Sequence, residues 1–199
     1  MNNVSVQVLH LNVGKRRTVQ NSLLNDVSIK DFDAISVVEP YVFQHPQSGR
    51  PIIAQDRHWQ VFTPSTQRTG VLAKYAFRQA LWVNTELRAT QIPIACHDIA
   101  AVLLQMEKGK LLLIACYEAR DGASTLDREN ALTERFQAIA EAREKAEREA
   151  EGRRVEVLVC ADLNRHHPLW GGQHGNRIRE RTNQGRVSTK QTQTDNLSV

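Results

Sequence analysis

Apolar and polar positions at the start of the chain predict a strand, a helix and a second strand. Apolar and polar residues alternate strictly in the first part of residues 4–12, which is typical of a strand that begins half buried. Apolar residues recur at helical spacing over 18–29, and a short apolar run over 34–38 predicts the next strand. That strand stops before Pro40, because proline cannot donate to a ladder. This order of elements indicates an α/β domain.

The pattern beyond residue 40 predicts further strands and one long helix. Residues 41–79 are rich in Pro, Gly and polar residues and read as a surface connection with one strand over 59–63. Residues 107–110 carry a turn signal between two apolar runs, which predicts a hairpin. The other expected elements are strands over 80–83, 99–106, 111–116 and 155–160 and a helix over 127–151.

The long helix and the end of the chain differ in pattern. Leu132, Phe136 and Ile139 predict the buried face of the helix, and the alternating charges over 141–149 predict a solvated surface. No apolar period survives in residues 173–199, a polar and mainly basic stretch that predicts disorder. We therefore expect one domain over residues 1–172 and a disordered tail over 173–199.

Composition narrows the class of protein. Hydrophobic residues make up 41% of the chain and charged residues 24%, which is typical of a globular protein. The net charge of +4 tolerates a polyanionic partner without demonstrating one. Cys96, Cys116 and Cys160 lie in apolar runs and predict buried free thiols and a reducing compartment. Without a signal peptide or a bilayer-length apolar stretch, we expect an intracellular protein of nucleus or cytoplasm, away from membranes.

Several predicted strands end in side chains suited to metal-assisted phosphoryl chemistry. These residues are Asn12, Glu39, Tyr117 and the pair Asp162 and Asn164. Ligands of α/β sheets gather beyond the carboxyl ends of strands, so we expect these side chains to share a cleft. If the segment after the last strand stays extended, Asp162 and Asn164 point to the same side.

Each of these side chains suits one part of phosphodiester hydrolysis. Glu39 is the natural ligand for a hard cation, and Asn12 supports it directly or through a water. Asp162 accepts a proton from the attacking water, and Asn164 holds that water or a phosphate oxygen. Tyr117 donates its phenol to a phosphate oxygen or to the leaving group.

The same residues also have structural interpretations. Asp and Asn at strand ends commonly cap turns, Glu39 before proline also marks the end of a strand, and Tyr117 also suits a core position. Three histidines, His166, His167 and His174, raise the question of zinc, but no cysteine accompanies them and adjacent histidines are poorly spaced for one tetrahedral ion.

Residues 162–172 carry the most specific pattern in the chain. Their sequence, Asp-Leu-Asn-Arg-His-His-Pro-Leu-Trp-Gly-Gly, resembles the Asp-Phe-Asn-x-His-x-x-Trp-Gly segment of the endonuclease/exonuclease/phosphatase superfamily. Residues 8–13 and 35–41 resemble the first two motifs of that family. The resemblance is strongest to the apurinic-like endonuclease of non-LTR (LINE-type) retrotransposons.

The resemblance implies a fold and an activity. The fold is a four-layer α/β sandwich of two mixed β-sheets flanked by helices. The activity is Mg²⁺-dependent hydrolysis of a phosphodiester, with Mn²⁺ as the alternative ion and no small organic cofactor. The retrotransposon branch nicks target DNA and leaves a 3′-hydroxyl that primes reverse transcription.

The resemblance also assigns roles to single residues. It places Asn12 and Glu39 at the metal, Tyr117 at the phosphate, and Asp162 and Asn164 at the nucleophile. On their position and chemistry, we expect the DNA contacts to come from Arg165, His166, Trp170, Lys15 and Arg16. The alternatives are a supporting role in the loop for His166 and Trp170 and a solvated turn for Lys15 and Arg16.

The chain departs from the family pattern after Gly172. The family continues with more strands and a Ser-Asp-His segment, and its retrotransposon members with a polymerase, whereas only the polar stretch follows here. We therefore expect a sandwich that is incomplete at the C-terminus. Two alternatives to a nuclease stay open: an inactive remnant that at most binds nucleic acid, and a phosphoesterase with a small-molecule substrate.

Overall fold

The computed structural model describes residues 6–54, 56–66, 77–118 and 125–164. Their elements in chain order are β1 (Val8–Asn12), α1 (Arg17–Asn25), the 3₁₀ helix η1 (Val27–Asp31), β2 (Ala34–Val38), β3 (Val42–Gln44), β4 (Pro51–Ile53), β5 (Trp59–Phe62), β6 (Gln79–Asn84), β7 (Ala89–Gln91), β8 (Ile99–Met106), β9 (Gly109–Tyr117), α2 (Thr125–Glu149) and β10 (Val155–Asp162). All of these elements belong to one unit, residues 1–163.

Two mixed four-stranded sheets form the centre of this unit. Their strand orders are β1-β2-β6-β5 and β10-β9-β8-β7, and a separate short ladder joins β3 to β4. The pairs β1–β2 and β9–β10 are parallel, whereas the other pairs are antiparallel. In each sheet two parallel strands therefore bring their carboxyl ends to the same edge.

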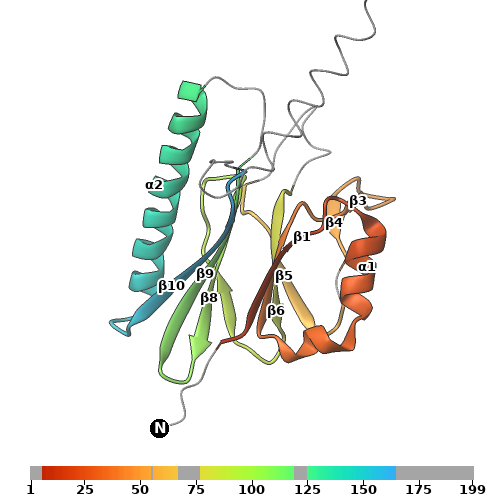
Figure 1. The fold of residues 1–199 in the computed structure, drawn as a ribbon. Coiled ribbons are helices and arrows are strands. Elements are labelled where there is room, and N and C mark those ends of the chain that lie inside the picture. Colours follow the sequence, from red (N-terminus) through yellow and green to blue (C-terminus); the bar gives the residue numbers. More distant parts are fainter. Residues whose placement is uncertain (1–5, 55, 67–76, 119–124, 165–199) are drawn as a thin grey trace, which may run out of the picture. The chain divides into compact units, whose positions relative to one another are not determined.

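Three apolar clusters stack the elements into four layers (Figure 1). Leu23 and Leu24 of α1 pack on the outer face of the first sheet. Ala142 and Ala146 of α2 pack on the outer face of the second sheet. Between them, Leu81 of β6 and Leu113 of β9 belong to the cluster that joins the two sheets. The expected α/β sandwich with flanking helices is confirmed.

Alternation along the strands decides which side chains point between the sheets. In β9, residues 111, 113 and 115 face the other sheet, and residues 112, 114 and 116 face α2. Tyr117 continues the first set, and Asp162 of β10 continues the side of Cys160, which belongs to the same inter-sheet cluster. Val8 packs on that cluster too, so Asn12 of β1 points the same way.

Several local predictions differ from the structure. The helix expected over 18–29 ends at Asn25, because the Asp26 side chain accepts from Ser28 N–H at 2.9 Å and caps the separate η1. The connection over 41–79 contains the unpredicted ladder of β3 and β4. The unpredicted β7 pairs with β8. These strands are too short to show a period.

The buried face of α2 was predicted only in part. Ile139 packs against the cluster between α2 and the second sheet, as expected. Phe136 is 58% exposed, whereas Ala142, Ala146 and the following Ala150 are fully buried. Small side chains let the helix approach the sheet closely, and a face made of alanine is hard to recognise from hydrophobicity alone.

Strand β10 presents an exposed apolar edge. Val157, Leu158 and Val159 are 40%, 38% and 40% exposed. Among the described residues, β10 pairs only with β9, so its other edge has no ladder partner there. Exposed apolar edge strands pair readily with other chains.

We expect this edge to drive concentration-dependent self-association. Replacing Val157 and Val159 with lysine should keep the protein monomeric at concentrations where the native chain associates, as measured by sedimentation velocity. Val27→Lys is the matched control, because Val27 is 74% exposed and lies in η1. Equal association of the native chain and the double variant would rule this edge out.

Candidate active site

The first half of the site lies where β1 and β2 end. The Oδ1 atom of Asn12 accepts the N–H of Gly14 at 2.7 Å, which fixes the amide plane. Glu39 follows β2 with φ of 49°, a left-handed conformation that is strained for a residue with a side chain. Its N–H donates to the Arg78 carbonyl and its carbonyl accepts from the Lys15 N–H, both at 2.7 Å. Both backbone hydrogen bonds therefore hold the strained residue in place.

The left-handed turn redirects the Glu39 side chain. Ile35 and Val37 of β2 face α1, and strict alternation would send Glu39 to that same outer face. The observed carboxylate instead meets Tyr117, which belongs to the opposite sheet. Strain of this kind, on the order of 1–3 kcal/mol, persists at sites where function requires an unusual direction.

The second half of the site lies where β9 and β10 end. Tyr117 and Asp162 are direct partners in the parallel register of these strands. The N–H of Glu118 donates to the Asp162 carbonyl at 2.9 Å and closes the ladder. The phenol and the carboxylate therefore leave the second sheet side by side.

Two hydrogen bonds between side chains join the halves across the sandwich. Asn12 Nδ2 donates to Asp162 Oδ2 at 3.1 Å, and the Tyr117 hydroxyl donates to Glu39 Oε1 at 2.8 Å. The ends of four strands from both sheets thus meet in one place. Glu39 and Asp162 belong to the same cluster, as the sequence predicted.

Two cations lie beside this cluster. The Lys15 Nζ atom is 3.5 Å from Glu39 Oε1. The guanidinium carbon of Arg78 lies 5.6 Å from the centre of the Tyr117 ring, a cation–π distance. Lys15 was predicted as a DNA contact, whereas Arg78 was missed, because its position just before β6 carries no recognisable signal.

His10 is a second residue that the sequence did not indicate. It lies two positions before Asn12 on the same face of β1, and its Nδ1 is 3.0 Å from the Ser36 hydroxyl. Partial burial lowers the pKa of His10, while the negative charge of Asp162 and a hydrogen bond with the Ser36 backbone oppose this shift. A neutral imidazole is therefore favoured beside Asp162.

The cysteines do not fit the role of nucleophile. Burial raises the pKa of Cys116 to about 12 and raises the pKa values of Cys96 and Cys160 as well. All are free thiols, as predicted, but Cys96 is only partly buried. A thiolate at neutral pH is thus disfavoured even at Cys160, two residues before Asp162.

The remaining predicted site residues are Arg16, Asn164 and three residues outside the described part of the chain. Arg16 precedes α1 and is exposed. Asn164 has φ of 48°, so the segment after β10 is not extended as expected; asparagine tolerates this left-handed conformation well. Arg165, His166 and Trp170, like the expected tail over 173–199, lie outside the described residues.

The donor set of the cluster fits a hard cation. Glu39 and Asp162 supply carboxylates, and Asn12 Oδ1 keeps a second lone pair beside its bond to Gly14. Mg²⁺ commonly takes one or two carboxylates and retains several waters. Among the described residues, no group of three or more His, Cys, Asp or Glu side chains is arranged to hold a metal, which excludes a closed zinc-type cage there.

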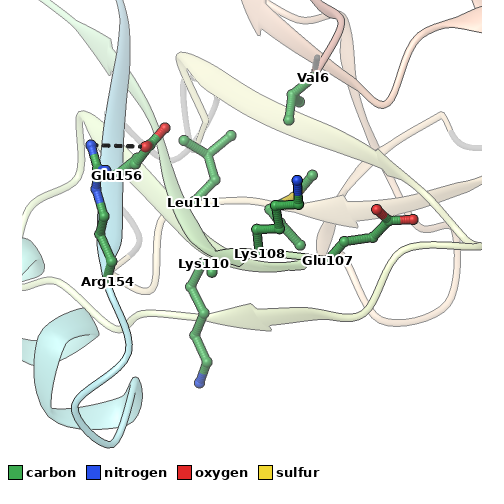
Figure 2. Close-up of a pocket in the computed structure, with 9 residues that line it drawn as sticks. Val6, Glu107, Lys108, Lys110, Leu111, Arg154 and Glu156 are labelled. Carbon is green, nitrogen blue, oxygen red and sulfur yellow. Dashed lines mark ion pairs between the residues drawn. The ribbon is translucent and has the colours of Figure 1, made fainter. Parts of the chain in front are cut away.

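A cavity of about 220 Å³ lies elsewhere, where β9 and β10 begin (Figure 2). Lys108, Lys110 and Arg154 line it, and Arg154 pairs with Glu156 at 3.2 Å. Tyr117 lies seven residues further along β9 than Lys110, roughly 20 Å at the rise of a strand. The cavity is therefore separate from the polar cluster.

No helix in the described part of the chain is both long and apolar enough to cross a bilayer.

Comparisons with solved structures identify the fold. The endonuclease domain of TRAS1, a telomere-specific non-LTR retrotransposon, matches with a TM-score of 0.54 and 18% identity, over 85% of this chain and 64% of that one. TDP2 of D. rerio in complex with a single-strand DNA product matches with a TM-score of 0.51 and 12% identity, over 83% and 63%. No family model and no curated protein matches the sequence.

This chain spans less than two thirds of the length of both solved domains. The chain therefore has the α/β sandwich fold of these solved domains.

Proposed function

We propose that this chain is a metal-dependent phosphodiesterase domain that nicks DNA, of the type found in non-LTR retrotransposons. The observation that carries the proposal is the pair of side-chain hydrogen bonds that bring Glu39, Tyr117, Asn12 and Asp162 together from two sheets. Residues that only cap turns at the ends of strands would not be expected to form side-chain hydrogen bonds between the two sheets. The nature of the TRAS1 domain and the DNA product bound to TDP2 support the choice of substrate.

The metal would be held by Glu39 and Asn12. A bound Mg²⁺ would polarise a phosphate oxygen and stabilise the charge that develops during hydrolysis. The ammonium of Lys15, 3.5 Å from Glu39 Oε1, adds positive charge at the edge of this position. Together with the nearby Arg78, it favours the approach of a polyanion.

Asp162 is the residue best suited to accept a proton from the attacking water. Its Oδ2 receives a hydrogen bond from Asn12, which fixes the direction of the carboxylate beside the proposed metal position. The Tyr117 hydroxyl donates to Glu39 in this structure and would donate to a phosphate oxygen of a bound substrate. Asn164 would hold the water or the phosphate.

The direct test is the conversion of supercoiled plasmid to nicked circles by the purified chain. We expect nicking with Mg²⁺, none with a chelator, and 3′ ends that a DNA polymerase extends without further treatment. The control for contaminating nuclease is the double variant Glu39→Gln and Asp162→Asn, purified in parallel. Nicking that survives in this variant would contradict the proposal.

Two other outcomes would identify the alternative functions. DNA binding whose affinity falls with salt, without cleavage at any metal concentration, would indicate an inactive nucleic-acid-binding domain. Release of phosphate from small esters with intact plasmid would indicate a small-molecule phosphoesterase.

A further inference from the structure

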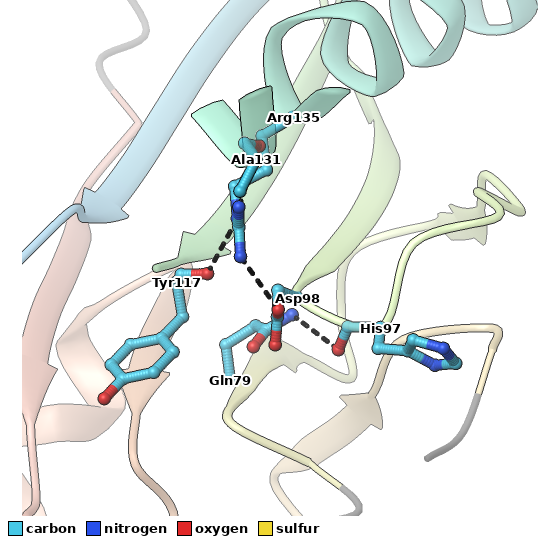
Figure 3. A network of polar contacts seen from close by, with 6 residues as sticks. All are labelled: Gln79, His97, Asp98, Tyr117, Ala131 and Arg135. Atoms are coloured by element: carbon cyan, nitrogen blue, oxygen red, sulfur yellow. Dashed lines mark hydrogen bonds and ion pairs between the residues drawn. The ribbon is translucent and has the colours of Figure 1, made fainter. Parts of the chain in front are cut away.

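All three guanidinium nitrogens of Arg135, in α2, donate hydrogen bonds, and they join α2 to the end of β9 and to the residue before β8 (Figure 3). Its Nε donates to the Tyr117 carbonyl at 3.2 Å, and its Nη2 donates to Asp98 Oδ2 at 3.0 Å. Its Nη1 donates to the carbonyl of Ala131, one turn back in the helix, at 2.8 Å. The side chains of Arg135 and Asp98 are only 12% and 8% exposed. The arginine therefore has little freedom to rotate.

Asp98 completes the attachment from the other side. It lies directly before β8, and its carbonyl accepts the Tyr117 N–H at 3.0 Å. The two residues of one ion pair thus bind both backbone polar groups of Tyr117, Arg135 through its Nε and Asp98 through its backbone carbonyl. Buried ion pairs are weak contributors to stability, because desolvation offsets much of their attraction, but they are well suited to fix a direction.

The direction that is fixed here is that of the phenol. Tyr117 ends β9, where the ladder alone constrains the backbone less than it does in the middle of a strand. The hydroxyl of this residue reaches Glu39 Oε1 at 2.8 Å, a contact between the two sheets. Arg135 itself contacts Tyr117 only through the backbone, so its influence on the site passes through Tyr117.

We propose that Arg135 and Asp98 form a positioning pair that holds the Tyr117 phenol in place for the reaction. The proposal rests on the proposed function, because it gives the phenol a role at the phosphate. Small displacements of a group that contacts the reacting atoms have large effects on rate, about a hundredfold for 1 Å. Arg135 belongs to α2, whereas the phenol that the pair positions contacts Glu39 of the opposite sheet.

The test substitutes Arg135→Lys, which keeps the charge but replaces the planar three-nitrogen fork that reaches Tyr117, Ala131 and Asp98 with a single nitrogen. We expect kcat for plasmid nicking to fall by about tenfold to a hundredfold with little change in KM. In a Tyr117→Phe background the same substitution should have little further effect, since the phenol is already absent. Arg143→Lys is the matched control, an exposed arginine on the same helix whose partner is Glu147.

Independent losses would overturn the proposal. If Arg135→Lys lowers kcat as much in the Tyr117→Phe background as in the native chain, the arginine serves the fold and not the phenol. An unchanged kcat in Arg135→Lys would overturn it as well. Asp98→Asn keeps the carbonyl bond to Tyr117 but removes the ion pair. If the lysine variant fails to fold, Asp98→Asn can be compared in the native and Tyr117→Phe backgrounds in the same way.

A measurement without catalysis separates this proposal from the proposed function. The ¹³C resonances of labelled tyrosine rings report the surroundings of the phenol, and the Tyr117 signal is the one lost in Tyr117→Phe. This signal should shift in Arg135→Lys and Asp98→Asn but not in Arg143→Lys. A shift in a chain without nuclease activity would refute the nuclease and leave the positioning pair intact. An unmoved signal would refute the pair.

Discussion

Glu39→Gln is expected to lower the rate of plasmid nicking on the order of a thousandfold. The substitution keeps the size of the side chain and an oxygen that accepts from Tyr117. It removes the negative charge that would hold the cation and that pairs with Lys15 at 3.5 Å. The measurement is the initial rate across a series of Mg²⁺ concentrations, where we expect the half-saturating concentration to rise steeply.

Asp162→Asn tests whether the carboxylates of Glu39 and Asp162 have different roles. It should lower the rate at saturating Mg²⁺ by a similar factor while changing the half-saturating concentration less, because a proton acceptor is lost and Glu39 is retained. Glu86→Gln is the control, an exposed carboxylate beyond the far end of β6. If the Glu39→Gln variant nicks plasmid as fast as the Glu86→Gln variant, the Glu39 carboxylate takes no part in the chemistry.

The second large effect is on stability. Leu113→Ala should lower the free energy of unfolding by ~2–5 kcal/mol, because it removes buried methyl groups and leaves a cavity. Leu113 is fully buried in the cluster that joins the two sheets. Urea denaturation followed by circular dichroism gives the value. Val27→Ala is the control, since Val27 is 74% exposed and surface changes of this kind have effects near zero.

This stability prediction also bears on the site. Leu113 and Tyr117 lie on the same face of β9, and the packing of that face sets the distance between the sheets. The contacts from Asn12 to Asp162 and from Tyr117 to Glu39 both cross that gap. We therefore expect Leu113→Ala to lower the rate of plasmid nicking even at temperatures at which the variant is still folded. Full activity in a variant destabilised by the expected amount would show that the sheets keep their spacing without this leucine.

The ends of the long strands, and the polar side chains that stand there, were predictable from the sequence. Apolar runs fix where a strand can be buried, and polar side chains such as Asn12 and Asp162 mark where it emerges. The hairpin between β8 and β9 follows from the turn residues Glu107 and Lys108 in the same way. The elements the sequence did not predict, such as β3, β4 and β7, are three residues each and too short to carry a period.

The directions of the side chains were decided by the tertiary structure. Alternation along β2 predicts that Glu39 faces α1, and only its left-handed backbone turns it toward Tyr117. The roles of Arg78, Asp98 and Arg135 depend on residues far away in the chain, so no local pattern indicates them. The sequence by itself determined where the strands end and which chemical groups stand there. Tertiary structure alone decided which of these groups meet, because hydrogen bonds between two sheets depend on how the sheets pack.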